Sequence, residues 1–294
     1  MSDADGRLRD GPSGTPVVVI HLPAAALREY ITFYYFVTAD GPVDDFLYPE
    51  WGNVRFAVQG DWRVVMDGYG PEAQVEVLFG PTDRCARVTT DGGRVVGFGL
   101  TPVGWHRLLG ESANRMANRV RSLGDELGPS ASELRRALAL DDSAAASVAR
   151  LDQALGAALG RRPQTPAILL RLDHMLRTRP TDVVRFATAV GVSPRSLQRL
   201  CLDLYGFAPK RLLRRQRFLD TLGRFRIAVG ESLETAMDPK YVDQAHFYRD
   251  FRDFMGMSPR AYFRASRALM RRAAQAQEAA GVTLSFELPP TTER

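Results

Sequence analysis

The sequence is poor in the residues and motifs that catalysis or metal binding requires. Its 294 residues include two cysteines and four histidines, and these are not grouped at the spacing of a metal site. The sequence has no Gly-x-Ser-x-Gly elbow, no phosphate-binding loop and no dinucleotide fingerprint. We therefore expect a protein that is not an enzyme and that holds no metal and no cofactor.

The sequence also lacks long apolar runs. None approaches the roughly 20 residues that a membrane-spanning helix needs. Residues 1–14 are polar and rich in Asp and Gly, without the apolar core of a signal peptide. We expect a cytoplasmic protein with no membrane partner, in which residues 1–14 form a disordered arm. Cys85 and Cys201 are expected to be separate buried thiols in a reducing compartment.

The periodicity of the sequence changes near residue 101. Before it, short runs rich in Val, Ile, Phe and Tyr are separated by Gly, Pro and Asp, which is typical of a small barrel or sandwich. The expected strands are Val17–Leu22, Ile31–Val37, Val54–Val58, Trp62–Met66, Val75–Phe79 and Val95–Leu100. From Trp105 to Leu159 the pattern becomes helical. We predict a β-rich domain over residues 15–160 with a helical C-terminal part, a linker over 161–166, and a second domain over 166–265. A C-terminal helix and tail follow over 266–294.

Positive charge is concentrated in the second of these domains. Pro166–Ala265 contains 18 Lys and Arg against 10 Asp and Glu, a net charge of +8. The whole chain is +5, so the remaining residues together carry −3. A basic excess confined to one domain is the electrostatic footprint that binding to phosphates requires, and it also fits a merely solvated surface.

Residues 186–202 have the pattern of a helix, a tight turn and a second helix. Gly191 suits a turn with positive φ, Ser193 suits the N-cap of the next helix, and Pro194 suits its first turn. The periodicity of the second helix turns Leu197 inward and three polar side chains outward. These outward residues are Arg195, Gln198 and Arg199. Arg and Gln one turn apart on an exposed helix are suited to reading base edges in a major groove.

The same pattern recurs over Leu233–Phe251. Phe247 and Phe251 take the core positions, and Arg249 repeats Arg199 fifty positions later. Each copy ends in a similar exit segment, Tyr205-Gly206-Phe207-Ala208-Pro209 and Met255-Gly256-Met257-Ser258-Pro259. A motif repeated in register is a stronger signal than either copy alone.

These residues resemble the DNA-binding domain of the AraC/XylS family of bacterial transcription regulators. The resemblance covers Pro166–Ala265 and is carried above all by Asp243-Gln244-Ala245-His246-Phe247-x-Arg249-x-Phe251 with Gly256-Met257-Ser258-Pro259-x-x-Tyr262. Lys240 stands where the family usually has Gly, so the second turn is expected to be reshaped. Leu47–Asn53 and Val96–Gly104 resemble elements of the cupin-like β-barrel sensor domain that precedes some of these DNA-binding domains. The fold implied is α+β with two domains: a cupin-like barrel with following helices, then an all-α domain with two helix-turn-helix motifs.

The resemblance and the helical pattern together nominate the DNA contacts. Base contacts are expected from Arg195, Gln198 and Arg199 of the first motif, and from Gln244, Ala245, Tyr248 and Arg249 of the second. Backbone contacts are expected from Ser193, Lys210, Arg211, Arg214 and Arg215. Solvated helix residues are the competing interpretation of each, and for Arg249 also a salt bridge to Asp243 or Asp253.

The resemblance implies further partners. These are double-stranded DNA, RNA polymerase, an unknown small-molecule effector and a second copy of the chain in a homodimer. Tyr34, Trp51 and Trp62 are candidates for lining the effector pocket, with ordinary barrel core as the alternative. Leu134, Leu138, Val148, Leu151 and Leu155 recur at helical spacing, so we expect dimerisation through Ser130–Leu159, with packing onto the barrel as the alternative.

Two other functions stay open at this point. In one, the protein is a ligand-independent DNA-binding regulator whose N-terminal barrel serves only dimerisation. In the other, the barrel is an enzyme that the C-terminal half directs to DNA, against which the missing catalytic constellation speaks.

Overall fold

Two antiparallel sheets build the first half of the protein. The computed structural model describes residues 15–66, 75–124, 131–227, 241, 243–265 and 267–282. The larger sheet has the order β1-β2-β8-β4-β6-β9 and the smaller sheet the order β3-β7-β5. The strands are Val17–His21 (β1), Ile31–Ala39 (β2), Val43–Leu47 (β3), Asn53–Gln59 (β4), Arg63–Val65 (β5), Glu76–Phe79 (β6), Ala86–Thr90 (β7), Gly93–Leu100 (β8) and Val120–Ser122 (β9). Each strand expected from the sequence coincides with one of these.

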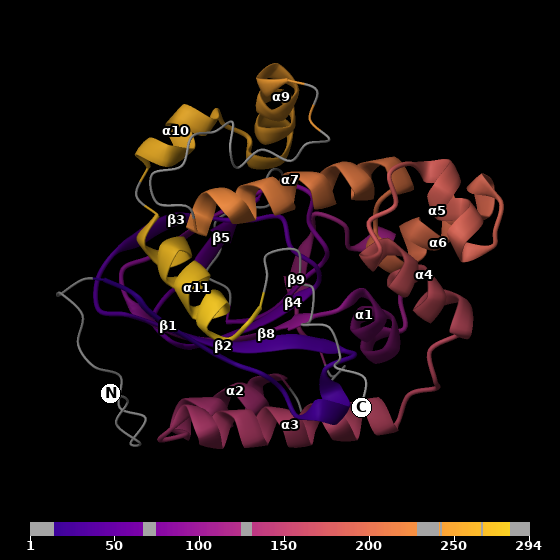
Figure 1. Ribbon diagram of the computed structural model, residues 1–294. Helices are drawn as coiled ribbons and strands as arrows, with labels where there is room; N and C mark the ends of the chain where they lie inside the picture. The colour runs from indigo at the N-terminus through magenta and orange to yellow at the C-terminus, as the bar shows by residue number, and fades with distance from the viewer. Residues whose placement is uncertain are drawn as a thin grey trace.

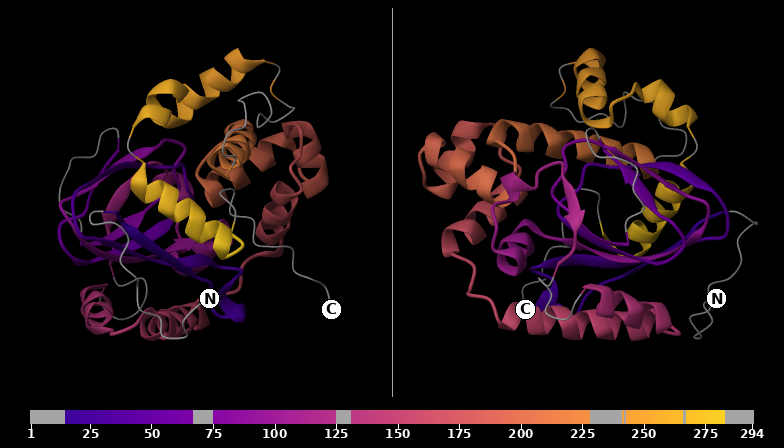
Figure 2. Two further views of the ribbon diagram at one scale, coloured as in Figure 1. Left: turned by 60° about the vertical axis from the view of Figure 1, so that its left-hand side comes forward. Right: turned by 180° about the vertical axis from the view of Figure 1, so that it is seen from behind.

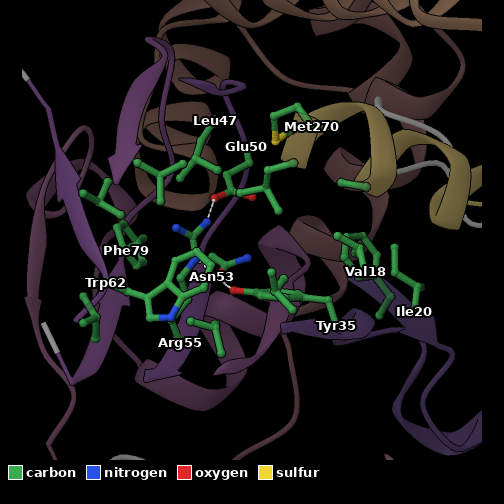
Figure 3. Close-up of a pocket in the computed structure, with 18 of the residues that line it drawn as sticks. Val18, Ile20, Tyr35, Leu47, Glu50, Asn53, Arg55, Trp62, Phe79 and Met270 are labelled. Carbon is green, nitrogen blue, oxygen red and sulfur yellow. Dashed lines mark hydrogen bonds and ion pairs between the residues drawn. The ribbon is translucent and has the colours of Figure 1, made fainter. Parts of the chain in front are cut away.

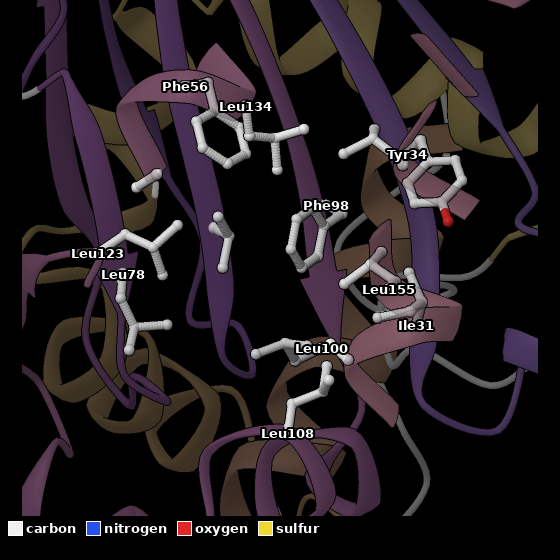
Figure 4. Packing of buried hydrophobic residues seen from close by; sticks show 14 of the residues in the cluster. Ile31, Tyr34, Phe56, Leu78, Phe98, Leu100, Leu108, Leu123, Leu134 and Leu155 are labelled. Carbon is white, nitrogen blue, oxygen red and sulfur yellow. The ribbon is translucent and has the colours of Figure 1, made fainter. Parts of the chain in front are cut away.

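Alternation along the strands gives the larger sheet two apolar faces, because successive side chains point to opposite sides. Phe56 and Leu78 belong to the face that packs against helices (Figure 4). Ala57, Val77 and Phe79 belong to the other face, which shares an interior with the smaller sheet. The helical side is formed by α1 (Pro102–Leu109), α2 (Ala131–Leu140) and α3 (Ala144–Gly160), with the short turns η1 (Ala25–Leu27) and η2 (Ala113–Arg115).

Four leucines of α2 and α3 pack against the larger sheet. Leu138, Leu151 and Leu155 are completely buried and Leu134 nearly so, all in the cluster beneath the larger sheet. Both views in Figure 2 keep α2 and α3 beneath the sheet. Packing onto the β-rich domain, the alternative considered above, therefore accounts for these four side chains, and dimerisation of the chain stays a prediction.

The second half is helical and consists of two groups joined by one long helix. The first group is α4 (Ala167–Arg177), α5 (Val183–Val190) and α6 (Pro194–Tyr205), and the second is α9 (Gln244–Met255) and α10 (Pro259–Arg264). The long helix α7 (Pro209–Ile227) runs between them, and α11 (Ala268–Ala279) returns to the sheets (Figure 1). Each group has its own apolar cluster, the first around Phe186 and Leu197, the second around Phe247 and Phe251.

The predicted fold class is confirmed: an antiparallel β-rich region is followed by a helical domain. Within the described ranges the strand pairing forms two facing sheets rather than one continuously paired barrel. Three predictions lie outside the described residues, namely the arm over 1–14, the second turn around Lys240 and the tail after 282. Among the described residues no helix is long and apolar enough to span a membrane.

Candidate nucleic-acid interface

The first recognition helix, α6, is set by its own sequence at both ends. The Ser193 hydroxyl accepts a hydrogen bond from the backbone N–H of Ser196 at 3.2 Å, and Pro194 occupies the first turn. The preceding α5 ends at Gly191 with φ 79°, a left-handed conformation that glycine enters without a Cβ penalty. Asp182 caps α5 by accepting the backbone N–H of Arg185 at 2.8 Å. The expected turn and cap are therefore both present.

One side of α6 is core and the other is solvent. Leu197 and Cys201 are completely buried against α4 and α5, and burial raises the pKa of the Cys201 thiol to about 12. The opposite side carries the three expected base-reading residues, Arg195, Gln198 and Arg199, all exposed. The arrangement suits a helix that inserts its polar edge into a groove while its apolar edge stays in the domain.

The second recognition helix, α9, repeats these features. Asp243 caps it by accepting the backbone N–H of His246 at 2.6 Å. Phe247 and Phe251 are completely buried. The four side chains expected to touch bases, Gln244, Ala245, Tyr248 and Arg249, are exposed. Among the described ion pairs Arg249 joins neither Asp243 nor Asp253, so its competing structural role has no contact to support it.

Both recognition helices end in the same way. Gly206 follows α6 with φ 81° and Gly256 follows α9 with φ 67°. The next helices, α7 and α10, begin at Pro209 and Pro259. The two units are thus duplicated in local geometry as well as in sequence.

The basic residues of α7 behave differently from the sequence-based expectation. Lys210 is exposed. Arg211 bonds Asp83 through Nε at 2.6 Å and also pairs with Asp253. Arg214 bonds Asp250 at 2.6 Å and Asp253 at 2.8 Å. These two guanidinium groups hold α9 onto α7, so of the three only Lys210 faces solvent as predicted.

Arg215 does not face outward at all. Its exposed fraction is 2 %, and its guanidinium carbon lies 4.0 Å from the centre of the Trp51 ring. Its Nε and one terminal nitrogen have no acceptor among the described residues. Burial lowers the pKa of Arg215 to about 9, while the carboxylates of Asp83 and Glu50 favour its charged form. The expected contact to DNA phosphate is excluded in this conformation.

A groove lies between the two helix-turn-helix units. It has an empty volume of about 1410 Å³, its open side included. Its basic lining residues are Arg179, Lys210, Arg214, Arg217 and Arg249, and its acidic ones Asp182, Asp220 and Asp250. The groove brings Lys210 of the expected backbone set together with Arg249 of the second recognition helix, which the spacing in the sequence does not reveal.

The helical domain is docked on the β-rich domain at several further points. The Tyr48 and Tyr262 hydroxyls form a short hydrogen bond in a buried position. The backbone N–H of Cys85 donates to Phe254 O at 2.8 Å, and its half-buried thiol donates to Met255 O at 2.8 Å. Tyr262 is therefore a buried structural residue, and the second helix-turn-helix unit contacts both the β3–β4 connection and the residue before β7.

One of the three candidate pocket residues lies at the cavity between the sheets. Trp62 lines it. Tyr34 is completely buried on the helical face of the larger sheet and donates to Asp152 at 2.7 Å. Trp51 lies at the domain interface beneath Arg215. Tyr34 and Trp51 thus do not line this cavity. Among the described residues no three His, Cys, Asp or Glu side chains are placed to hold a metal.

Comparisons with known proteins bear on the second half of the chain. Residues 186–265 match a family model described as a helix-turn-helix domain. This match spans both recognition helices and the helix that joins them. No curated protein matches the sequence.

Solved structures of similar shape are distant. An apo ToxT variant from Vibrio cholerae strain SCE256 is 11% identical with a TM-score of 0.43, covering 87% of this chain and 98% of that one. A second ToxT structure from Vibrio cholerae is 9% identical with a TM-score of 0.45, covering 85% and 97%. The AraC-like transcriptional activator CuxR is 16% identical with a TM-score of 0.28, covering 69% and 86%.

Proposed function

We propose that this protein, whose residues 186–265 form an AraC-type helix-turn-helix domain, regulates transcription by reading DNA with α6 and α9 under the control of a small molecule bound in its β-rich domain. The DNA-binding regulator class follows from the domain. Which residues contact the bases, and control by an effector, are what we propose. The observation that supports it most is the duplicated geometry, in which two capped helices each bury one edge and expose Arg and Gln on the other.

The exposed residues suggest how bases are discriminated. Arg195, Arg199 and Arg249 are candidates for bidentate hydrogen bonds to guanine, and Gln198 and Gln244 for adenine, each worth ~1–3 kcal/mol of discrimination. Ala245 and the ring of Tyr248 offer apolar contact to a thymine methyl group. Two such helices on either side of the long α7 suit successive major-groove segments, about 10 bp apart, on one face of the DNA.

Fewer residues are assigned to phosphate contacts than the sequence suggests. Ser193 and Lys210 are exposed, whereas Arg211 and Arg214 are engaged with aspartates and Arg215 is buried. We keep Ser193 and Lys210 as backbone contacts. Operator occupancy, or contact of the bound protein with RNA polymerase, then alters transcription.

Selection of genomic fragments with the purified full-length protein, followed by variants on the selected site, tests this function. Arg199→Ala is expected to cost ~1–3 kcal/mol on that site and to relax the preference at one base pair. Arg185→Ala removes an exposed arginine from α5, outside the recognition helix, and serves as the matched control. An equal loss on selected and random DNA for Arg199→Ala would show that Arg199 only holds phosphate, and failure to select any sequence would contradict the function itself.

A further inference from the structure

The cavity between the two sheets is completed by a helix from the far end of the chain. Leu269, Met270 and Ala273 of α11 line it together with residues of both sheets. Figure 3 shows Met270 at the cavity opposite Arg55 of β4 and Trp62, which directly precedes β5. The enclosed space of the cavity is about 110 Å³, and an apolar cavity of about 150 Å³ is known to hold a ligand such as benzene. The helical half of the chain therefore supplies one wall of a pocket in the β-rich half.

Four polar residues of the cavity wall, Tyr35, Glu50, Asn53 and Arg55, bond one another. Arg55 donates to Glu50 at 2.9 Å and through Nε to the Tyr35 hydroxyl at 2.9 Å. The Tyr35 hydroxyl donates to Asn53 at 2.6 Å. The guanidinium and the carboxylate balance each other, and the rest of the wall is mainly apolar. A charged ligand would bury an uncompensated charge here, so the wall favours an uncharged molecule.

One buried donor in the wall still needs an acceptor. The exposed fraction of Trp62 is 7 %, and its indole N–H has no hydrogen-bond partner among the described residues. Buried N–H groups are nearly always paired in native proteins. A ligand that carries a carbonyl, ether or hydroxyl oxygen would supply the missing acceptor.

The helix α11, which covers the cavity, is connected to the second helix-turn-helix unit. The backbone N–H of Met270 donates to Asp45 at 2.9 Å, which holds the start of α11 on β3. Just before it, the guanidinium carbon of Arg267 lies 4.7 Å from the centre of the Tyr262 ring on α10. A change in the seating of α11 is therefore transmitted to α10 over a few residues.

Resting on the proposed function, we propose that this cavity is the effector site, that it takes an uncharged and largely apolar molecule bearing a hydrogen-bond acceptor, and that α11 is the lid through which occupancy reaches the second recognition helix. The ligand class follows from the balanced charges and the unpaired indole N–H. The coupling follows from the fact that α11 is both cavity wall and continuation of the DNA-binding domain.

The test uses full-length protein and Prodan, a neutral naphthyl ketone whose fluorescence reports its surroundings. We expect binding with a dissociation constant on the order of 100 µM or tighter, as a ligand of this size can reach in an apolar pocket. The anionic dye anilinonaphthalene sulfonate should bind at least about tenfold more weakly, since burying its charge is costly. Trp62→Phe should weaken Prodan binding by about threefold to tenfold and shift its emission to the blue, because the carbonyl loses a donor. No saturable Prodan binding, or tighter binding of the anionic dye, would overturn the assignment of site and ligand class.

Two alanines on α11 separate cavity filling from general disturbance of the helix. Ala273 lines the cavity and Ala279 is exposed, so Ala273→Trp should abolish Prodan binding while Ala279→Trp leaves it unchanged. In the wild type, Prodan should slow hydrogen exchange in residues 267–282 and change the dissociation constant for DNA at least about threefold. In Ala273→Trp, Prodan should change neither quantity. If Prodan bound without changing the affinity for DNA, the proposed role of α11 in coupling the cavity to the DNA-binding domain would be contradicted. Loss of sequence-specific DNA binding without any probe would instead contradict the proposed function.

Discussion

The guanidinium carbon of Arg215 on α7 lies 4.0 Å from the centre of the Trp51 ring in the β-rich domain. A cation over an aromatic face is stabilising, and more so when both groups are shielded from water. Arg215 sits on the helix that joins the two helix-turn-helix units, and Trp51 follows Glu50, which binds Arg55 in the cavity. The contact therefore ties the cavity wall to the DNA-binding domain at a second point besides α11.

Replacing Lys210 and Arg215 separately should give different salt dependences. Lys210→Gln should make the slope of log affinity against log salt shallower by about 0.9, the value of one released counterion. Arg215→Gln should leave the slope unchanged, because its guanidinium is buried against Trp51. Titration of a random duplex at several salt concentrations measures both. A shallower slope for Arg215→Gln would mean that the domains separate on DNA and expose it.

The packing of α2 and α3 can be tested through two leucines. Leu155 is completely buried beneath the larger sheet, whereas Leu140 is 85 % exposed. Leu155→Ala should lower the free energy of unfolding by about 2–5 kcal/mol, and Leu140→Ala should change it by less than about 0.5 kcal/mol. Chemical denaturation provides the numbers. If light scattering showed a dimer that Leu155→Ala dissociates without loss of stability, the intramolecular packing would be refuted.

The cap of α5 predicts a pH-dependent contribution to stability. The backbone N–H of Arg185 holds the pKa of Asp182 below its ordinary 3.8. The stabilisation by its charge is therefore complete above pH 3.8 and is lost as the pH falls through the folded-state value. Asp182→Ala should lower the melting temperature at pH 7, and Asp182→Asn, which keeps an accepting oxygen, should lower it less. If the melting temperatures of the wild type and Asp182→Asn still differed at a pH well below the folded-state pKa of Asp182, the stabilisation by charge would be contradicted.

The parts of the fold that depend on neighbouring residues were predictable from the sequence. Ser193 and Gly191 act within one turn of the helix that they begin or end, so their residue types indicate the cap and the turn directly. Strand positions such as Val54 and Phe56 followed in the same way from a short run of strand-forming residues bounded by turn residues. The exposed sides of α6 and α9 followed from helical periodicity.

The contacts between the two halves of the chain were not predictable. An arginine on an amphipathic helix has the same pattern whether it meets phosphate, as expected for Arg215, or a tryptophan from another domain. The apolar side of α11 likewise indicates burial without a partner, and only the structure places Met270 in the cavity. For the leucines of α2 and α3, helical spacing likewise does not distinguish packing on a partner subunit from packing on the chain's own sheet.

Guanine-methylation protection on the selected operator tests the central claim that two recognition helices read DNA in successive grooves. The wild-type protein should protect two groups of guanines about 10 bp apart. Arg199→Ala should remove protection in one group and Arg249→Ala in the other, with the second group intact in each case. A single protected group, or the same guanines lost in both variants, would contradict reading by α6 and α9 as two separate units.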